Sequence, residues 1–385
     1  MQKISILIVK SIISFLIITI KLEYNTRSLI EFHIFTKNNN SMFTKNDISQ
    51  IEGKGLKLED VELQINNFKK GFPYINLVGA ATPTNGLHSY SDDKATELAK
   101  FFDDNYKDYD LLKFVPASGA ASRMFKHLFE FMTSYTGSEA DIAEYEKDKS
   151  FNSVFNFFNK IESFAFYTQL KDCLAADNHD LTKLIKEKNF KLVLEYFLTD
   201  KGLDYAAMPK GLLLFHDYPQ SPRYAVEEHL VEAAVYSTDS DKKSKLHLTV
   251  SPDHESKFKT VVAEKSPKFE TQFNVSYEID FSEQMSHTDM IAVDLDNEAF
   301  RTDDGKLLFR PGGHGALIEN LNRLESEIVF VKNIDNIVPD RLRDTTYTYK
   351  KVIGGLLFKL QIKSFDYLEL LECANLDDEK IEEIS

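Results

Sequence analysis

The sequence predicts an α/β protein with a mostly parallel, mixed sheet, helices on both faces of that sheet and an inserted run of helices. Two observations predict this class. From residue 211 onward, short apolar segments typical of buried strands alternate with segments of helical periodicity. Residues 136–204, rich in Phe, Asn, Lys and Glu, have helical spacing with few breakers, which indicates a helical insertion with aromatic packing.

The composition is that of a folded, acidic protein. The chain has 385 residues, of which 43% are hydrophobic, and a formal net charge of −15. This length allows one large domain or two ordinary ones. The acidic balance argues against a general nucleic-acid or membrane-surface binder. Cys173 and Cys373 are far apart and have no metal or redox spacing, which predicts reduced thiols and a cytoplasmic protein.

The N-terminal residues 1–41 differ from the rest of the chain. The run Ile4–Ile20 is strongly apolar but contains Lys10, and as a helix it would rise about 25 Å, which is marginal for a bilayer core. No A-x-A cleavage site follows it. We expect residues 1–41 to lie outside the folded unit, as the product of a start codon placed too early, and we expect no membrane contact. The alternative is a signal anchor formed by residues 1–20.

Residues 42–111 are predicted to be mostly helical. Apolar residues at helical spacing predict helices over Ser49–Phe72 and Asp92–Phe102, separated by the Pro-, Gly- and Asn-rich stretch Ala81–Tyr90. The apolar run Leu111–Pro116 stops at proline and predicts a buried strand. The stripe of apolar residues that follows predicts a helix over Arg123–Met132.

The C-terminal half alternates strands with helices. The predicted strands are Leu212–Phe215, Leu246–Val250, Asn274–Ile279, Met290–Val293 and Ile328–Val331. The predicted helices are Val226–Tyr236, His254–Ala263, Leu317–Leu324 and Val352–Leu371. We therefore expect one α/β domain over residues 42–340, with its insertion at 136–204, and a C-terminal helical segment over 341–385.

The segment Val115–Lys126 (VPASGAASRMFK) joins the first predicted strand to the next helix. A small, Gly-containing loop at such a junction offers backbone N–H groups to an anion, and the helix N-terminus adds partial positive charge. Arg123 and Lys126 lie three residues apart, where their charges oppose the helix dipole. A phosphate bound in the loop would explain this placement. The alternative is a tight turn with solvated cations.

Three later segments contain candidate ligand-binding residues. Lys210 lies in a Pro-Lys-Gly turn ahead of an apolar strand, either facing a ligand or simply exposed. The loop Phe309–Gly315 (FRPGGHG) has three glycines, which give access to a flat ligand, and His314 either positions this loop or is a structural histidine. Asp335 follows a strand end, where a carboxylate can hold Mg²⁺. Its neighbours (NIDN) also suit an Asx turn.

Together and in this order, the segments resemble the motifs of sugar-phosphate nucleotidyltransferases, and in particular those of UDP-sugar pyrophosphorylases. The residues that match the phosphate loop of this superfamily are Ala117, Gly119, Ser122, Arg123, Met124 and Lys126. Ser118 and Ala121 stand where that loop usually has glycine, and Ala316 follows the Pro-Gly-Gly-His-Gly turn where Asp is usual. The chain from Met42 looks like a poorly characterised bacterial family of this superfamily, with no settled activity. We expect the chain to be truncated, because members of that family continue beyond this length.

The resemblance implies a Rossmann-like, nucleotide-diphospho-sugar transferase fold and two substrates, a nucleoside triphosphate and a sugar phosphate, with no nucleic acid. It implies catalytic roles for Arg123, Lys126 and Lys210 at the phosphates, and Mg²⁺ held by Asp335. The implied nucleotide-binding residues are Ala117, Ser118, Gly119, Ala120, Ala121, Ser122, Gly312, Gly313, His314 and Gly315. The alternative function is nucleotide or sugar-phosphate binding without turnover.

Overall fold

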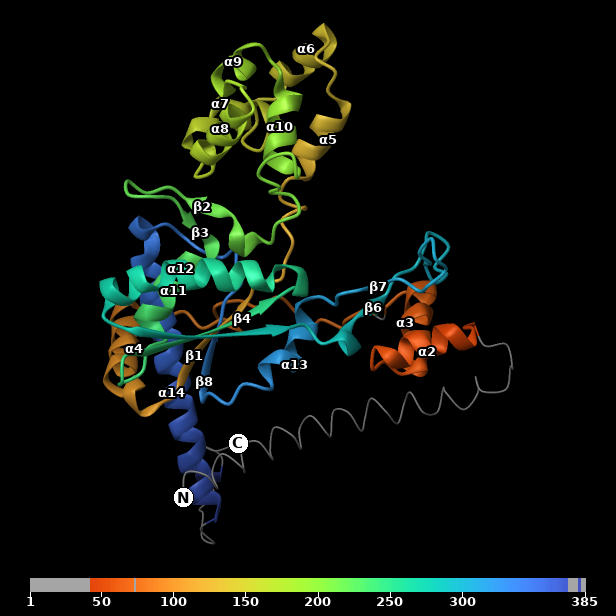
Figure 1. Cartoon of the computed structure of the whole chain (residues 1–385). Coiled ribbons are helices and arrows are strands. Elements are labelled where there is room, and N and C mark those ends of the chain that lie inside the picture. The colour runs from red at the N-terminus through yellow and green to blue at the C-terminus, as the bar shows by residue number, and fades with distance from the viewer. Residues whose placement is uncertain (1–41, 73, 373–379, 382–385) are drawn as a thin grey trace. The chain divides into compact units, whose positions relative to one another are not determined.

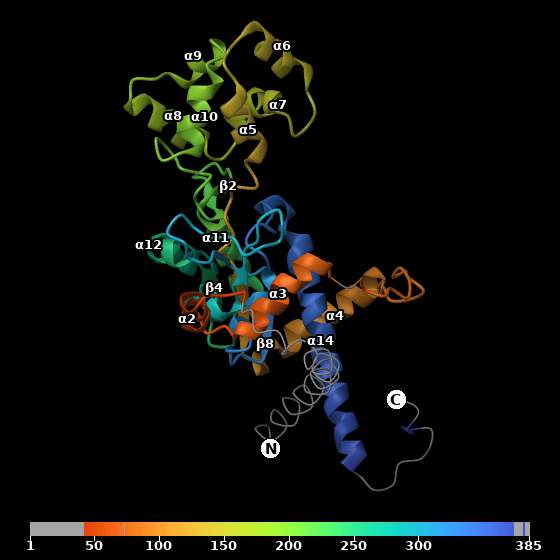
Figure 2. The same cartoon turned by 90° about the vertical axis from the view of Figure 1, so that its right-hand side faces the viewer.

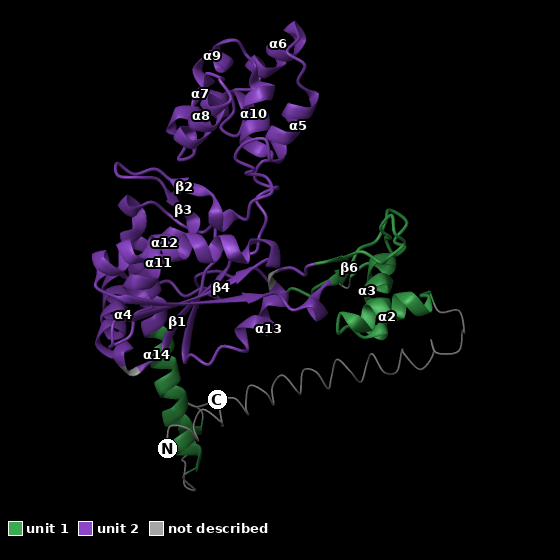
Figure 3. Cartoon of the chain, viewed as in Figure 1, with its two compact units in different colours: residues 1–78, 290–310, 356–385 green, residues 79–289, 311–355 purple. Residues whose placement is uncertain are grey.

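The computed structural model describes residues 42–72, 74–372 and 380–381, so the apolar run Ile4–Ile20 lies outside the described residues. The chain divides into two compact units (Figure 3). Unit 1 comprises Met1–Val78, Met290–Arg310 and Leu356–Ser385, and unit 2 comprises Gly79–Asp289 and Pro311–Gly355. Within the described residues, no helix has the length and apolar character that crossing a membrane requires.

Unit 2 contains a four-stranded, fully parallel sheet. Its strands in spatial order are β5 (Ser276–Glu283), β4 (Lys243–Val250), β1 (Leu111–Pro116) and β8 (Ile328–Val331). Numbered along the chain, this order is 3-2-1-4, so the winding of the sheet reverses between β1 and β8. In doubly wound sheets, ligands bind outside the carboxyl ends of the strands at such a reversal.

The predicted α/β class and the mainly parallel character of the sheet are confirmed, but the sheet was predicted to be mixed and all its strand pairs are parallel. The predicted strands Leu111–Pro116 and Ile328–Val331 have the same bounds in the structure. Both are short apolar runs that end at proline or at a polar turn, so the sequence marks their limits. The predicted strands at 246–250 and 274–279 overlap β4 and β5, which are longer.

One face of the sheet is covered by α11 (Ala225–Tyr236) and α12 (Glu255–Phe273) (Figure 1). Apolar side chains of both helices form a buried core with strand residues, among them Val115, Leu246 and Leu248. The prediction ended the second helix at Ala263, but α12 continues for ten more residues, because Phe269 is buried in the same core. On the other face, Leu317 packs with Leu112 and Phe114 just before the short α13 (Ile318–Leu321).

The first part of the long helix α14 (Arg343–Glu372) packs against α4 (Asp92–Asn105) within unit 2. Two glycines make this contact possible. A Cβ atom on Gly354 would lie 2.6 Å from the ring of Phe102, and one on Gly355 would lie 2.0 Å from the carbonyl oxygen of Leu98. The Gly-Gly pair therefore serves close helix packing, at a cost in helix propensity.

The chain segment that connects β1 to β2 (Leu214–His216) forms a group of helices (Figure 2). These helices share a separate core that is rich in aromatic side chains. The helices are α5 (Lys126–Ser134), α6 (Glu139–Lys147), α7 (Val154–Asn159), α8 (Tyr167–Ala176), α9 (Leu181–Lys186) and α10 (Phe190–Leu198). The rings of Phe166 and Phe197 lie 4.3 Å apart, and those of Phe158 and Phe190 are equally close. After this group, β2 pairs in antiparallel fashion with β3 (Arg223–Tyr224).

Unit 1 contains α2 (Lys45–Gly53), α3 (Leu58–Lys70) and the antiparallel pair of β6 (Met290–Ile291) and β7 (Phe309–Arg310). The single helix predicted over 49–72 is therefore wrong: the chain turns after Gly53, with Gly55 at a positive φ of 78°. The strand predicted at 290–293 is shorter than expected and lies outside the parallel sheet, because its partner is β7.

Candidate functional site

The loop after β1 is tied to two other segments of unit 2. The N–H of Ala117 donates to the carbonyl oxygen of Thr249 at 2.8 Å, and the N–H of Ala121 donates to that of Met208 at 3.2 Å. Both alanine side chains are fully buried. The two alanines therefore anchor the loop to the fold, and their N–H groups are not available to the ligand predicted from the sequence.

The middle of this loop is open. Within the described residues, the N–H groups of Ser118, Gly119, Ala120, Ser122 and Arg123 donate no hydrogen bond. Gly119 and Ala120 are exposed, and a Cβ atom on Gly119 would meet nothing within 4 Å. Open N–H groups beside free space are what an anion requires from a backbone loop.

The helix predicted to start at Arg123 begins instead at Lys126. Residues 122–125 form turns, in which the N–H of Met124 donates to the carbonyl of Ala121 at 2.8 Å. The late start allows Phe125 to pack its ring 5.2 Å from that of Phe197 in the aromatic core. Arg123 therefore lies in a turn and not on the helix face it was expected to share with Lys126.

The charges of these two cations are arranged differently from the prediction. Arg123 is exposed and has no partner within the described residues. Lys126 does lie in the first turn of α5, where no acidic residue is present, but its Nζ is 3.7 Å from Oε1 of Glu130. Neither cation contacts Lys210 or Asp335 in the structure.

Lys210 and Asp335, which are far apart in the sequence, form an ion pair. Nζ of Lys210 lies 2.5 Å from Oδ2 of Asp335, with side-chain exposures of 22% and 35%. The backbone N–H of Lys210 donates to the carbonyl of Gly119 at 3.1 Å. The structure therefore gathers three of the predicted segments beside β1 and β8, where the winding of the sheet reverses. Asp335 is accessible enough to meet a ligand.

The turn that contains Asp335 is held in place by a hydrogen bond to α11. Ile334 is buried, and its carbonyl oxygen lies 3.1 Å from Nε2 of His229 on that helix. A Cβ atom on Gly211 would lie 3.3 Å from the Ile334 side chain and 2.6 Å from the ring of Phe258. Gly211 follows Lys210 and Ile334 precedes Asp335, so the chain neighbours of the two members of the ion pair lie close together.

A buried ionic cluster on α11 supports the same two strands. Glu232 is fully buried and accepts hydrogen bonds from Lys113 of β1 at 2.9 Å, from Lys332 at 2.6 Å and from the Tyr236 hydroxyl at 3.0 Å. Burial alone would raise the pKa of Glu232, but the two ammonium groups outweigh it and lower the pKa to about 2. Burial of Lys113 lowers its pKa to about 7, although Glu232 opposes the change.

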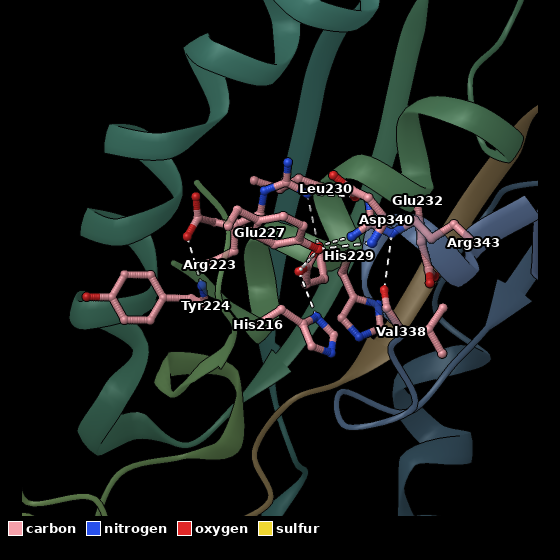
Figure 4. Close-up of polar contacts among 12 residues, drawn as sticks. His216, Arg223, Tyr224, Glu227, His229, Leu230, Glu232, Val338, Asp340 and Arg343 are labelled. Atoms are coloured by element: carbon pink, nitrogen blue, oxygen red, sulfur yellow. Dashed lines mark hydrogen bonds and ion pairs between the residues drawn. The ribbon is translucent and has the colours of Figure 1, made fainter. Parts of the chain in front are cut away.

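A second carboxylate of α11, Glu228, is the centre of another buried cluster. Its partners His216, Arg223 and Arg343 are labelled in Figure 4. Its oxygens lie 2.8 Å from Nδ1 of His216, 2.8 Å from the Tyr218 hydroxyl and 3.3 Å from Nη1 of Arg223. Arg343 also contacts Glu228. This carboxylate links the β2–β3 pair to the start of α14, and both of its oxygens have partners.

The sequence-based predictions missed His229, Glu228 and Glu232. A signal was present in the sequence. Lys113 interrupts the apolar run LLKFVP of a strand that is buried throughout, and a buried ammonium group requires a buried carboxylate. The segment EEHLVE within an otherwise apolar helix is the matching sequence.

The Gly-rich loop lies beside the end of β5. A Cβ atom on Gly312 would be 2.7 Å from the carbonyl oxygen of Thr288, so this glycine is needed for close packing. Nearby, Nδ2 of Asn320 donates to Oγ of Ser282 and to the carbonyl of Glu283, both at 2.8 Å. The side chain of His314 lies outside what the structure describes. β5 is two strands from β1, or about 10 Å, so the loop lies at the carboxyl edge of the same sheet.

The described residues contain no group of three His, Cys, Asp or Glu side chains that could hold a metal ion. Asp335 is one carboxylate, and it is paired with Lys210. Mg²⁺ at phosphate sites typically uses one or two carboxylates and takes its remaining ligands from water and phosphate. The donor set therefore fits Mg²⁺ only when a nucleotide supplies further oxygens.

The chain matches one family model, described as a domain of unknown function (DUF4301), over residues 44–385. No curated protein matches the chain, and no solved structure does. The match covers both compact units and every residue of the site described above.

Proposed function

The chain belongs to the DUF4301 family, whose function is unknown, and we propose that it is a sugar-phosphate nucleotidyltransferase. In this reaction, an oxygen of a sugar 1-phosphate attacks the α-phosphorus of a nucleoside triphosphate. The bond from the α-phosphorus to the bridging oxygen breaks, and pyrophosphate leaves with that oxygen. The substrate supplies its own nucleophile, so the protein has to align the two phosphates and neutralise their charge.

One observation carries the proposal. Lys210 joins the open loop through its backbone, at the Gly119 carbonyl, and joins Asp335 through its side chain. An ammonium group, a carboxylate and unpaired backbone N–H groups are thus gathered where a doubly wound sheet binds its ligands. This combination suits a phosphate chain that carries a divalent ion.

The residues of the site would divide the work as follows. The N–H groups of residues 118–120 would bind phosphate oxygens, and Lys210 would exchange Asp335 for a phosphate oxygen at the reacting centre. Asp335, once released, would hold Mg²⁺, whose contribution is to neutralise charge between the phosphates. Arg123, which has no partner among the residues that the structure describes, would bind the departing pyrophosphate, together with Lys126. Gly312–Gly315 would contact the base.

The test is exchange of labelled pyrophosphate into a panel of nucleoside triphosphates, with sugar 1-phosphates and Mg²⁺ present. We expect Asp335→Asn and Lys210→Met each to lower the exchange rate at least about 100-fold, because each removes charge stabilisation in the transition state. The matched control is Lys191→Met, since Lys191 is an exposed lysine of α10.

Three results are informative beyond the expected one. Nucleotide binding by calorimetry without any pyrophosphate exchange would support the alternative, a binding protein without turnover. If the wild-type protein binds no nucleotide in the presence of Mg²⁺, both proposals are wrong. If Lys191→Met lowers exchange as much as Lys210→Met, the site has been placed wrongly.

A cytoplasmic location is part of the proposal and is compatible with the free thiol of Cys173.

A further inference from the structure

His229 is an unusual residue for the centre of a buried helix. It is fully buried, and Nε2 lies 3.1 Å from the Ile334 carbonyl oxygen. A carbonyl can only accept, so Nε2 carries the hydrogen and Nδ1 is left as an acceptor. Nδ1 is buried and has no partner within the described residues. An unsatisfied buried acceptor costs about 1–3 kcal/mol, which offsets at least part of what the hydrogen bond of Nε2 contributes to stability.

The one hydrogen bond of this side chain is made at an informative place. The carbonyl of Ile334 belongs to the peptide group that leads into Asp335. The orientation of that peptide group sets the direction in which the Asp335 side chain leaves the backbone. The side chain of Ile334 is itself locked, because it packs against Gly211, the residue after Lys210. A rotation of this peptide would therefore move Asp335 relative to Lys210.

The neighbouring contacts of α11 hold the surroundings of this peptide in place. The backbone carbonyl of His229 accepts a hydrogen bond from Lys113 of β1 at 3.1 Å. Glu232, one turn further along, binds Lys332, three residues before Asp335. The helix thus fixes the two adjacent strands, and His229 fixes the turn that follows one of them.

We infer that His229 is a positioning residue, which holds the Ile334–Asp335 peptide so that Asp335 meets Lys210 and, in turn, the phosphates of the ligand. The identity of the ligand as a nucleotide rests on the proposed function, whereas the link from His229 to the Lys210–Asp335 pair does not. Substitution of a residue that holds a metal-binding or catalytic group in position typically lowers metal affinity or activity by 10- to 100-fold.

The test compares His229→Leu, which removes the donor, with His229→Gln, whose amide N–H can donate to the same carbonyl. We expect the Leu variant to weaken binding of the Mg²⁺–nucleotide complex about 10-fold in calorimetry. The Gln variant should recover most of the affinity. The matched control is Glu227→Gln on the same helix. Glu227 is also buried, but its carboxylate accepts from the N–H of Tyr224, away from the ion pair.

A second readout needs no ligand. With ¹⁵N-labelled lysine, NMR detects the ammonium group of Lys210, and the signal that disappears in Lys210→Arg is assigned to it. Slow hydrogen exchange of this ammonium group reports the ion pair with Asp335. We expect this signal to persist in the Gln variant and in Glu227→Gln, and to be lost in the Leu variant. If the Leu variant does not fold, His229→Met, which also removes the donor but has a more adaptable side chain, is measured in its place, and the same loss is expected.

The outcomes separate this inference from the proposed function. A wild-type protein that binds no nucleotide contradicts the proposed function, and the ammonium signal still decides the role of His229. If the Leu variant is less stable but keeps both the signal and the nucleotide affinity, His229 is merely structural and the inference is wrong.

Discussion

α10 and α11 are both buried helices, yet their buried side chains differ in kind. The buried residues of α10 are all apolar or aromatic, namely Phe190, Val193, Leu194, Tyr196, Phe197 and Leu198. α11 buries three carboxylates and an imidazole along with its apolar residues, namely Glu227, Glu228, His229 and Glu232. Burying a helix does not require buried charge, and ion pairs in a core are often no more stabilising than apolar packing.

The difference follows from what each helix contacts. α10 packs within a core of rings, where apolar burial alone provides the stabilisation. α11 packs against the strands and the turn that carry the candidate site. Two of its buried polar side chains bind defined atoms there, Glu232 at Nζ of Lys332 and His229 at the Ile334 carbonyl. Specific polar contacts fix position in a way that apolar packing does not. We therefore expect changes of Glu232 and His229 in α11 to affect both stability and ligand binding, and changes in α10 to affect stability alone.

The largest effect is expected from Glu232→Gln. This change leaves the buried ammonium of Lys113 without a carboxylate, and breaking a buried pair in this way costs about 3–5 kcal/mol. The free energy of unfolding in urea measures the loss. The control is Lys113→Met, which should cost less than half as much, because Glu232 keeps Lys332 and Tyr236 as partners. Equal losses in the two variants would contradict this account of the cluster.

The pH dependence of the same variant provides an independent check. In the folded protein the pKa of Glu232 is lowered to about 2, below its ordinary value of 4.5. A lowered carboxyl pKa contributes stability that is present above the ordinary value and is lost as pH falls through the folded-state value. The difference in unfolding free energy between wild type and Glu232→Gln should therefore shrink as pH falls from about 4.5 to about 2.

Leu194→Ala, in α10, is expected to have the next largest effect. Leu194 is fully buried in the aromatic core, and truncating a buried leucine costs about 2–5 kcal/mol through lost burial and the cavity left behind. Calorimetric unfolding measures the loss, and nucleotide affinity at a temperature where the variant is folded should equal that of wild type. A change of more than threefold in this affinity would show that the helical group contributes to the site.

The comparison also shows which features the sequence could predict. β1 and β8 were predicted to the residue because apolar runs that end at proline or at a polar turn determine local structure. The approach of Lys210 to Asp335 could be expected only from the resemblance to a known family, since the fold brings together segments that are distant in the sequence. The start of α5 was predicted three residues too early, since residues 122–125 form turns and Phe125 packs there against Phe197 of the distant α10. Lys113 within an apolar strand indicates that a buried carboxylate is needed, but its pairing with Glu232 and the contact of His229 with Ile334 come from the tertiary fold.

The smallest effect is expected from Asp180→Ala, which tests a polar contact of the helical group. Asp180 is the exposed N-cap of α9, and its Oδ1 accepts from the N–H of Lys183 at 2.8 Å. Losing such a cap costs about 1 kcal/mol, well below the effect expected for Glu232→Gln, because water can solvate the N–H that is left exposed. Asp180→Asn keeps an acceptor at the cap and should restore most of the stability. If Asp180→Ala instead matched Glu232→Gln in unfolding free energy, burial would not be the reason that the polar contacts of α11 matter more.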